Sequence, residues 1–209
     1  QFLIEKEYQN ALLLKNNEIK MLQAQINPHF LYNALENVCG MAAVGRTDLV
    51  TQTCGALARL FQYAVRPGSA VPLEEEIRYA ESYFYVMSQR HRDGLVLEVQ
   101  ADQEARGVRV PKMMLQPLVE NAMKHGRLEE RPGGIVCIRA GWGEDGVFFV
   151  TVSDNGRGIP EARREQLNRL LSGEEDGEAD CGGVGLSNVC LRLRQMFGES
   201  AGVRMEPAD

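Results

Sequence analysis

Apolar residues recur every three or four positions over residues 3–38, which is the period of an amphipathic helix. Within this stretch the apolar positions follow a seven-residue repeat, and most charged side chains lie off the apolar seam. The seam consists of Leu12, Ile19, Leu22 and Ile26. A sustained seven-residue repeat predicts a coiled-coil or bundle helix, and therefore a homodimer formed through the N-terminal helices.

A second helical stretch follows a break at residues 45–48, where we expect Thr47 or Asp48 to cap the next helix. Its apolar face consists of Leu49, Val50, Thr53, Leu57, Leu60, Phe61 and Ala64. Residues 66–69 end this helix, so we place a boundary there between domain 1–68 and domain 69–209. Two helices joined by a short loop predict a hairpin, and two such hairpins make a four-helix bundle.

The pattern after residue 69 mixes the helical period with strict alternation. A helix is predicted from Leu73 to about His91, with Glu74, Glu75 and Glu76 in its first turn, where the helix dipole favours acids. A further helix is predicted over Met114–Gly126. Alternating runs at 95–99, 135–140 and 147–152 predict strands, and Asp145-Gly146 predicts a hairpin turn between the last two. The expected fold class is α+β: an α/β sandwich with a mixed, mainly antiparallel sheet and helices on one face.

Composition narrows the function. The chain has 209 residues, a net charge of −6 and five scattered cysteines. The acidic balance argues against nucleic-acid binding, and the cysteine pattern predicts reduced thiols instead of a disulfide framework or a zinc site. No apolar run approaches the length of a membrane span, and no signal peptide is visible. The chain opens inside a helical pattern, so we expect a portion of a longer protein.

Pro28 and His29 stand inside the first helical pattern. Proline in a helix interior costs about 3 kcal/mol, because it removes a hydrogen bond and clashes with the preceding turn. Two interpretations follow. Either this is a kinked core helix with an incidental histidine, or the kink serves to present the imidazole of His29.

Two further clusters carry oxygen and nitrogen donors. Asn121 is a neutral oxygen ligand of the kind that suits Mg²⁺, and Lys124 lies on nearly the same helix face, where it can reach a phosphate. A solvated helix with a Glu120–Lys124 pair explains the same residues. Asp154 follows a strand and precedes two glycines. It can accept a hydrogen bond from an exocyclic amine, or it can form a simple turn at the end of the strand.

A glycine-rich turn at residues 182–186 is followed by helix-compatible sequence through Phe197. Glycines allow close approach of the backbone to phosphates, and a helix N-terminus offers free N–H groups to anions. Glycine turns at helix starts are common, so this cluster is informative only in combination with the others.

Together these clusters resemble the nucleotide-binding domain shared by gyrase, heat-shock chaperone, histidine kinase and mismatch-repair ATPases. Asn121 matches the N-box asparagine, residues 154–158 match the first glycine box, and residues 183–186 match the second. With the Pro28–Asn33 segment and the Leu115–Gly126 segment, the chain resembles the LytS-type family of bacterial sensor histidine kinases. The resemblance extends from about Met21 to Phe197.

The resemblance implies ATP-dependent phosphorylation of His29, followed by transfer to an aspartate of a response regulator. It also implies ATP with Mg²⁺ at Asn121, and the cytoplasmic portion of a bacterial membrane protein. Asn33 is the candidate to orient the imidazole, and Glu120 is a weaker candidate for the base. The expected nucleotide-binding residues are Asn121, Lys124, His125, Asp154, Gly156, Gly158, Gly183, Gly185 and Leu186.

Some positions depart from the family pattern. Phe30 follows the histidine where commoner histidine kinases carry an acid, Cys181 replaces a glycine of the second box, and the closing strand expected after residues 203–205 is missing. Residues 160–180 are expected to form a nucleotide lid. Two alternative functions follow: a catalytically degenerate nucleotide-binding signalling module, and a clamp ATPase. Pro117 disfavours the latter, because clamp ATPases carry a glutamate at that position.

Overall fold

The computed structural model describes residues 28–89, 94–128, 133–173 and 183–207. Contacts within the chain divide it into two compact units, residues 1–66 and 67–209. No helix in the described ranges is long and apolar enough to cross a membrane. None of the four cysteines within those ranges forms a disulfide.

The first unit contains helices α2 (Pro28–Ala43) and α3 (Thr47–Val65), which pack against each other as a hairpin. The predicted apolar face of α3 is confirmed in part, since one face of the helix is buried from Thr53 to Ala64. That face comprises Thr53, Ala56, Leu57, Leu60 and Ala64. The predicted seam at Leu12, Ile19, Leu22 and Ile26 lies outside the described residues, so the dimer stays a prediction.

The start of α3 corrects one expectation. The N-cap residue is Arg46, and no side chain forms a capping hydrogen bond, because Thr47 is already the first helical residue. Asp48 lies in the first turn, and its pKa is lowered mainly by the backbone N–H of Leu49 and then by a hydrogen bond from Arg46. The acid therefore stabilises the helix end from within the first turn.

The second unit contains a three-stranded sheet in the order β2 (Val96–Ala101), β4 (Ile135–Trp142) and β5 (Phe148–Asp154). The pair β2–β4 is parallel and the pair β4–β5 is antiparallel, so the sheet is mixed, as predicted, but antiparallel pairing does not predominate in it. The Asp145-Gly146 turn connects β4 to β5, and the N–H of Val147 donates to Asp145 Oδ1 at 3.0 Å. All three predicted strands and their hairpin are confirmed.

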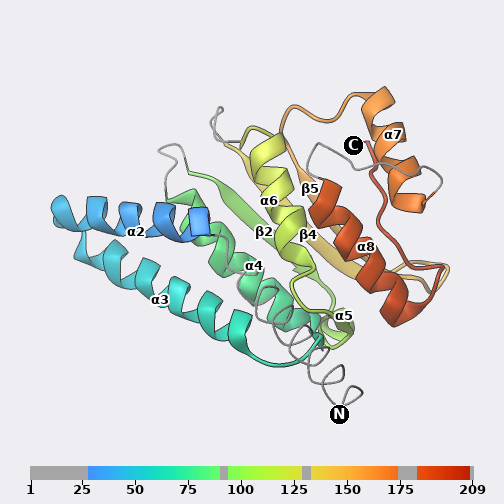
Figure 1. The fold of residues 1–209 in the computed structure, drawn as a ribbon, viewed down its shortest axis with the longest axis horizontal. Helices are drawn as coiled ribbons and strands as arrows, with labels where there is room; N and C mark the ends of the chain where they lie inside the picture. The colour runs from blue at the N-terminus through green and yellow to red at the C-terminus, as the bar shows by residue number, and fades with distance from the viewer. Residues whose placement is uncertain (1–27, 90–93, 129–132, 174–182, 208–209) are drawn as a thin grey trace, which may run out of the picture. The chain divides into compact units, whose positions relative to one another are not determined.

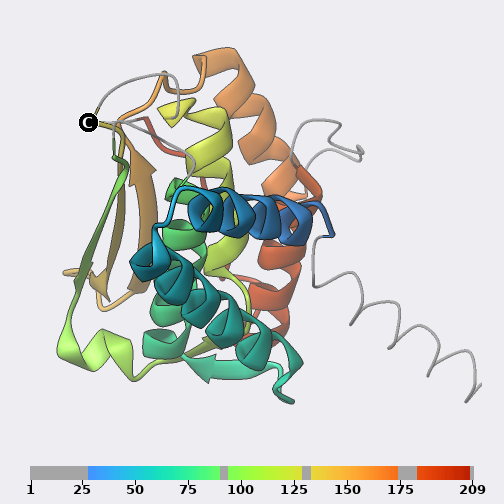
Figure 2. The same ribbon diagram turned by 90° about the vertical axis from the view of Figure 1, so that its left-hand side faces the viewer.

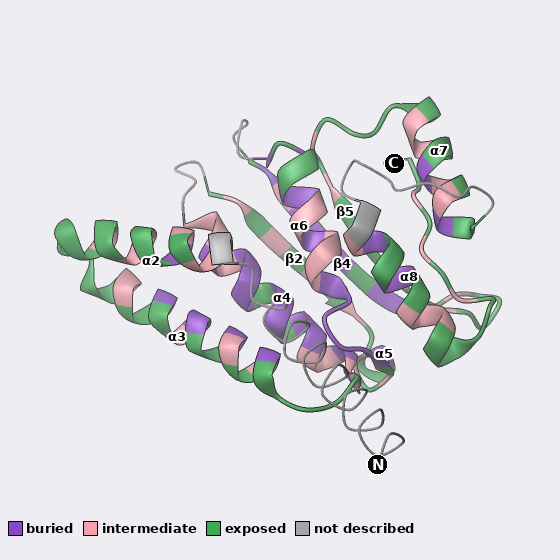
Figure 3. Cartoon of the chain, in the orientation of Figure 1, coloured by how far each residue is buried: buried purple, intermediate pink, exposed green. Residues whose placement is uncertain are grey.

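Helices α4 (Leu73–Ser88), α6 (Leu115–His125) and α8 (Gly183–Phe197) lie side by side on one face of this sheet (Figures 1 and 2). Figure 3 shows how strongly burial is concentrated on α4. Nine of its sixteen residues are buried, including Ile77, Ala80 and Phe84 from the predicted apolar face. The α+β sandwich is therefore confirmed, with α6 between α4 and α8 in its helical layer.

Three short elements do not follow from any sequence pattern. Strands β1 (Ala70–Pro72) and β3 (Arg109–Pro111) form a separate antiparallel pair, and α5 (Gln103–Arg106) is a single turn. Each has three or four residues, which is too short for a periodicity to appear. They depend on tertiary contacts, such as the Arg109 guanidinium donating to the Ala70 carbonyl at 2.6 Å.

Helix α7 (Glu161–Ser172) occupies the first half of the predicted lid, and residues 174–180 of that lid lie outside the described residues. The side chain of Asn168 on α7 exchanges two hydrogen bonds with the backbone of Met205, at 3.0 and 2.7 Å. Residues 201–207 are not in a strand. Val203 and Met205 instead pack on a cluster formed by Leu171, Leu186 and Cys190.

Candidate functional site

Asp154 is the last residue of β5, and its carboxylate turns back onto the loop that follows. Asp154 Oδ1 accepts a hydrogen bond from the N–H of Gly156 at 2.9 Å. This is the turn that one interpretation of the sequence expected, and it leaves the second carboxylate oxygen to other donors. The side chain is half-buried.

The end of α6 lies directly against this loop. A Cβ on Gly126 would lie 2.7 Å from Asp154 Oδ1, and a Cβ on Gly156 would lie 2.5 Å from the Cα of Gly126. Both positions therefore require glycine for steric reasons. Arg157 fixes the contact, because its N–H donates to the Gly126 carbonyl and its Nε donates to the His125 carbonyl, each at 3.2 Å.

Of the other candidate residues of α6, Asn121 lies in the middle of the helix, and Lys124 and His125 lie in its last turn. Asn121 is half-buried, whereas Lys124 and His125 are exposed. Pro117, one turn before Asn121, lies against the first turn of α8, where a Cβ on Gly185 would be 3.3 Å from Pro117 Cβ. Helix α6 thus contacts the first glycine segment at its C-terminal end and the second glycine segment near its N-terminal end.

The second glycine segment differs from its predicted form. Gly183 and Gly185 lie inside the first turn of α8, not in a turn that precedes the helix. Leu186 is 4% exposed and packs in the apolar cluster with Leu171 and Cys190, so only its backbone can face a ligand. Gly158, in the first segment, has a φ of +68°, a conformation that favours glycine.

Glu120 accepts a hydrogen bond from a side chain of α4. The phenol of Tyr83 donates a hydrogen bond to it, while burial, followed by the negative charge of Glu120, raises the pKa of Tyr83. Four residues earlier on both helices, the Tyr79 hydroxyl donates to Gln116 Oε1 at 3.0 Å. Two tyrosines one turn apart on α4 therefore bond two side chains one turn apart on α6, and the carboxylate of Glu120 is held in place.

His29 and Asn33 lie in α2, four residues apart, so they stand on the same helix face. The side chain of His29 lies outside the described residues, and Pro28 is the first described residue of α2. The proposed kink at Pro28 therefore stays a prediction. His29 belongs to the first unit and the nucleotide candidates belong to the second.

Sequence reasoning missed Glu76 and Arg192, which both contact the backbone just before α6. Glu76 was interpreted as an acid that stabilises the dipole of its own helix. A signal was available, because Glu76 falls on the same face as Leu73, Ile77 and Ala80, and an acid on a buried face needs a partner. Arg192 carries no comparable signal in the sequence.

The residues of the site fit a Mg²⁺ ion that is held by one protein oxygen, the side-chain oxygen of Asn121. Within the described ranges, no group of three or more His, Cys, Asp or Glu side chains could hold a metal ion. Asn121 supplies a single amide oxygen, on a half-buried side chain of α6. Mg²⁺ commonly binds through one or two protein oxygens and completes its shell with water and substrate phosphates.

Two family models match the chain. One, described as histidine kinase, matches residues 17–95, and the other, described as histidine kinase-, DNA gyrase B-, and HSP90-like ATPase, matches residues 108–208. Among solved structures, the histidine kinase domain of the Erythrobacter litoralis EL346 blue-light activated histidine kinase is 22% identical. The match covers 85% of this chain and 83% of that domain, at a TM-score of 0.44.

Curated relatives match nearly the whole chain. The sensor protein LytS of Bacillus cereus is 32% identical over 206 residues, which cover 97% of this chain and 33% of the relative. The sensor histidine kinase YesM of Bacillus subtilis is 31% identical over 97% of the chain, and BtsS of Escherichia coli is 31% identical over 94%. The aligned regions cover 33% of YesM and 32% of BtsS, so the chain spans about a third of the length of these relatives. The chain belongs to the LytS-type sensor histidine kinases.

Proposed function

We propose that this chain is the kinase portion of a two-component sensor, which transfers the γ-phosphoryl group of ATP to His29 and then to an aspartate of a response regulator. The observation that carries the proposal is the contact of α6 with both glycine segments, at Gly126–Gly156 and at Pro117–Gly185. It brings Asn121, Lys124 and Asp154 to one region of the second unit.

Asp154 is the proposed contact for the adenine base. Its second carboxylate oxygen can accept a hydrogen bond from an exocyclic amine, and the glycine loop at 156–158 leaves room for a flat ring. The 2.9 Å bond from Gly156 fixes the carboxylate before the nucleotide arrives. Preorganisation of this kind lowers the entropic cost of binding.

The phosphates are proposed to lie along α6 towards the first turn of α8. Lys124 supplies a positive charge, His125 borders the loop, and the backbone N–H groups around Gly183 and Gly185 supply donors at a helix N-terminus. Asn121 is the proposed Mg²⁺ ligand. Bound Mg²⁺ neutralises charge on the phosphates, which is the main requirement of phosphoryl transfer.

His29 is the proposed nucleophile. A neutral ring nitrogen attacks the γ-phosphorus, the bond from that phosphorus to the bridging oxygen of ADP breaks, and the proton on the other ring nitrogen passes to a base. Asn33, one turn along α2, is the proposed orienting residue, and Glu120 is the weaker candidate for the base. The phosphoryl group then passes to a regulator carboxylate, which regenerates His29.

The assembly is also part of the proposal. Two copies are expected to pair through the N-terminal helices, in line with the seven-residue repeat. Because the chain spans about a third of its relatives, we place it as the cytoplasmic portion of a longer bacterial membrane protein. The partners are a second copy, ATP and a response regulator, with no nucleic acid.

Incubation with γ-labelled ATP and Mg²⁺ tests the proposal. We expect acid-labile label on the parent, none on His29→Gln, and normal labelling of the control His91→Gln. ATP binding by His29→Gln should match the parent. ATP binding without label would favour a degenerate signalling module, and phosphate release without label would favour a clamp ATPase.

A further inference from the structure

Glu76 is a fully buried carboxylate on α4, with 0% of its surface exposed. It accepts hydrogen bonds from the N–H groups of Met113, Met114 and Leu115, at 2.5, 2.8 and 3.0 Å. These donors lie at the start of α6, where the first turn of a helix has no partners of its own. A side chain from a neighbouring helix therefore caps α6.

Arg192 holds the same turn from the other side. Its guanidinium extends from the middle of α8 and donates to the carbonyls of Lys112 at 2.5 Å and Met113 at 3.2 Å. Met113 has a φ of +60°, an uncommon conformation for a residue with a side chain. A carboxylate on the N–H side and a guanidinium on the carbonyl side together maintain this turn.

The two ends of α6 are consequently fixed by different contacts. Its C-terminal end is bound to the Asp154 loop through Gly126, Gly156 and Arg157. Its N-terminal end is bound to α8 through Arg192, and α8 carries Gly183 and Gly185 in its first turn. Loss of Arg192 leaves the contacts at the C-terminal end in place.

We propose that Glu76 and Arg192 are positioning residues for the phosphate end of the nucleotide site. They fix the start of α6 relative to α8, and so align Asn121 and Lys124 with the N-terminal turn of α8. This inference rests on the proposed function, and it adds residues that touch neither nucleotide nor metal. Burial lowers the pKa of Arg192, and the negative charge of Glu76 opposes that effect, so Glu76 favours the charged form of Arg192.

The test compares the affinities for ATP with Mg²⁺ and for adenosine, because adenosine lacks the phosphates. In Arg192→Met we expect ATP affinity to fall about tenfold and adenosine affinity to change less than about twofold. Arg192→Lys keeps one cationic donor and should lose less ATP affinity. If Arg192→Met does not fold, Arg192→Lys provides the comparison of ATP and adenosine affinities instead.

Arg106→Met is the matched control. Arg106 also binds a glutamate of α4 and a backbone carbonyl, but it lies on α5, away from α6. The affinities of the Arg106→Met variant for ATP with Mg²⁺ and for adenosine should equal those of the parent. Equal losses for ATP and adenosine in the Arg192 variants, or no loss for either, would overturn the positioning role. A parent that fails to bind ATP would instead contradict the proposed function.

Discussion

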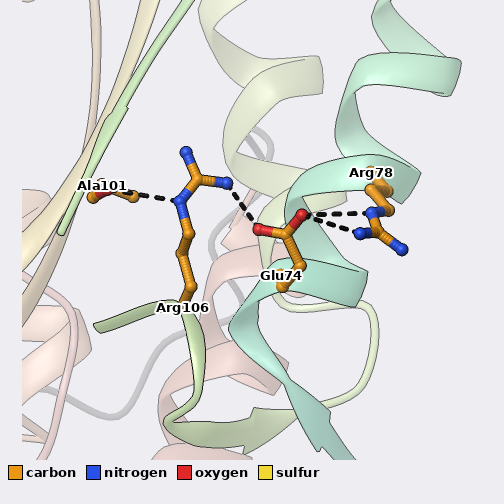
Figure 4. A network of polar contacts seen from close by, with 4 residues as sticks. All are labelled: Glu74, Arg78, Ala101 and Arg106. Atoms are coloured by element: carbon orange, nitrogen blue, oxygen red, sulfur yellow. Dashed lines mark hydrogen bonds and ion pairs between the residues drawn. The ribbon is translucent and has the colours of Figure 1, made fainter. Parts of the chain in front are cut away.

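Glu74 and Glu76 stand two residues apart in the first turn of α4, yet they have different surroundings. Glu74 is 30% exposed and pairs with Arg106 and, one turn along its own helix, with Arg78 (Figure 4). Glu76 is fully buried and bonds three backbone N–H groups of residues 113–115. Glu74 therefore belongs to a cluster of partly exposed charges, and Glu76 belongs to the interior.

Position on the helix face, and not residue type, therefore decides how much an acid contributes to stability. Arg106 and Arg78 can return to water when Glu74 is removed, so the loss of Glu74 should cost little stability. Removal of Glu76 leaves buried donors without acceptors, and each such group costs about 1–3 kcal/mol.

The largest effect is expected for Glu76→Ala. Loss of the buried carboxylate should lower the free energy of unfolding by about 3–5 kcal/mol, because the N–H groups before α6 lose their acceptor and Arg192 loses a nearby negative charge. Urea denaturation followed by circular dichroism measures it. A loss below that of Glu74→Ala would mean that water replaces the carboxylate.

Glu74→Ala should cost much less, about 1 kcal/mol. The 2.5 Å contact with Arg106 is the main loss, and Arg106 still donates to the Ala101 carbonyl at 3.3 Å. The same denaturation experiment applies, with Arg106→Ala and the double mutant completing a cycle. If Glu74→Ala proves as costly as Glu76→Ala, then position on the helix face does not explain the difference.

The pH dependence of stability sharpens the comparison. Arg106 and then Arg78 hold the pKa of Glu74 below its ordinary value of 4.5. A lowered pKa in the folded state means that the pair stabilises the fold fully above pH 4.5, and that this contribution is lost as the pH falls through the lowered value.

Melting curves of the parent and Glu74→Gln across this range measure the effect. The difference between the two should be constant above pH 4.5 and should shrink below it. A difference that stays constant as the pH falls through this range would show that the carboxylate gains nothing from its arginines in the folded state.

The smallest effect is expected for Arg78→Ala. Its side chain is 70% exposed, and it contacts Glu74 at 3.1 Å as an i,i+4 pair. Exposed pairs with this spacing contribute about 0.3–0.5 kcal/mol. Added salt should reduce the difference from the parent further, and an effect above that of Glu74→Ala would assign Arg78 a role outside this pair.

Much of the fold could be predicted from local pattern. Alternation located β2, β4 and β5, and the helical period located α4 and α6 to within a few residues. Patterns failed where elements are short, as for β1 and β3, and where a neighbouring position took the expected role, as for Arg46 at the start of α3. Such features depend on contacts between distant segments or on a one-residue difference, and a periodicity detects neither.

The amphipathic faces, the strand pattern and the motifs could all be recognised in the amino-acid sequence; the motifs are those at His29, Asn121, Asp154 and the second glycine segment. These properties are local, since they depend on residue type and spacing along the chain. Two features became visible only in the folded chain: Glu76 caps a different helix from its own, and Arg192 binds the other side of the same turn. An acid in the first turn of a helix can serve its own helix, the solvent or a neighbour, and the packing of α4 against α6 selects the last.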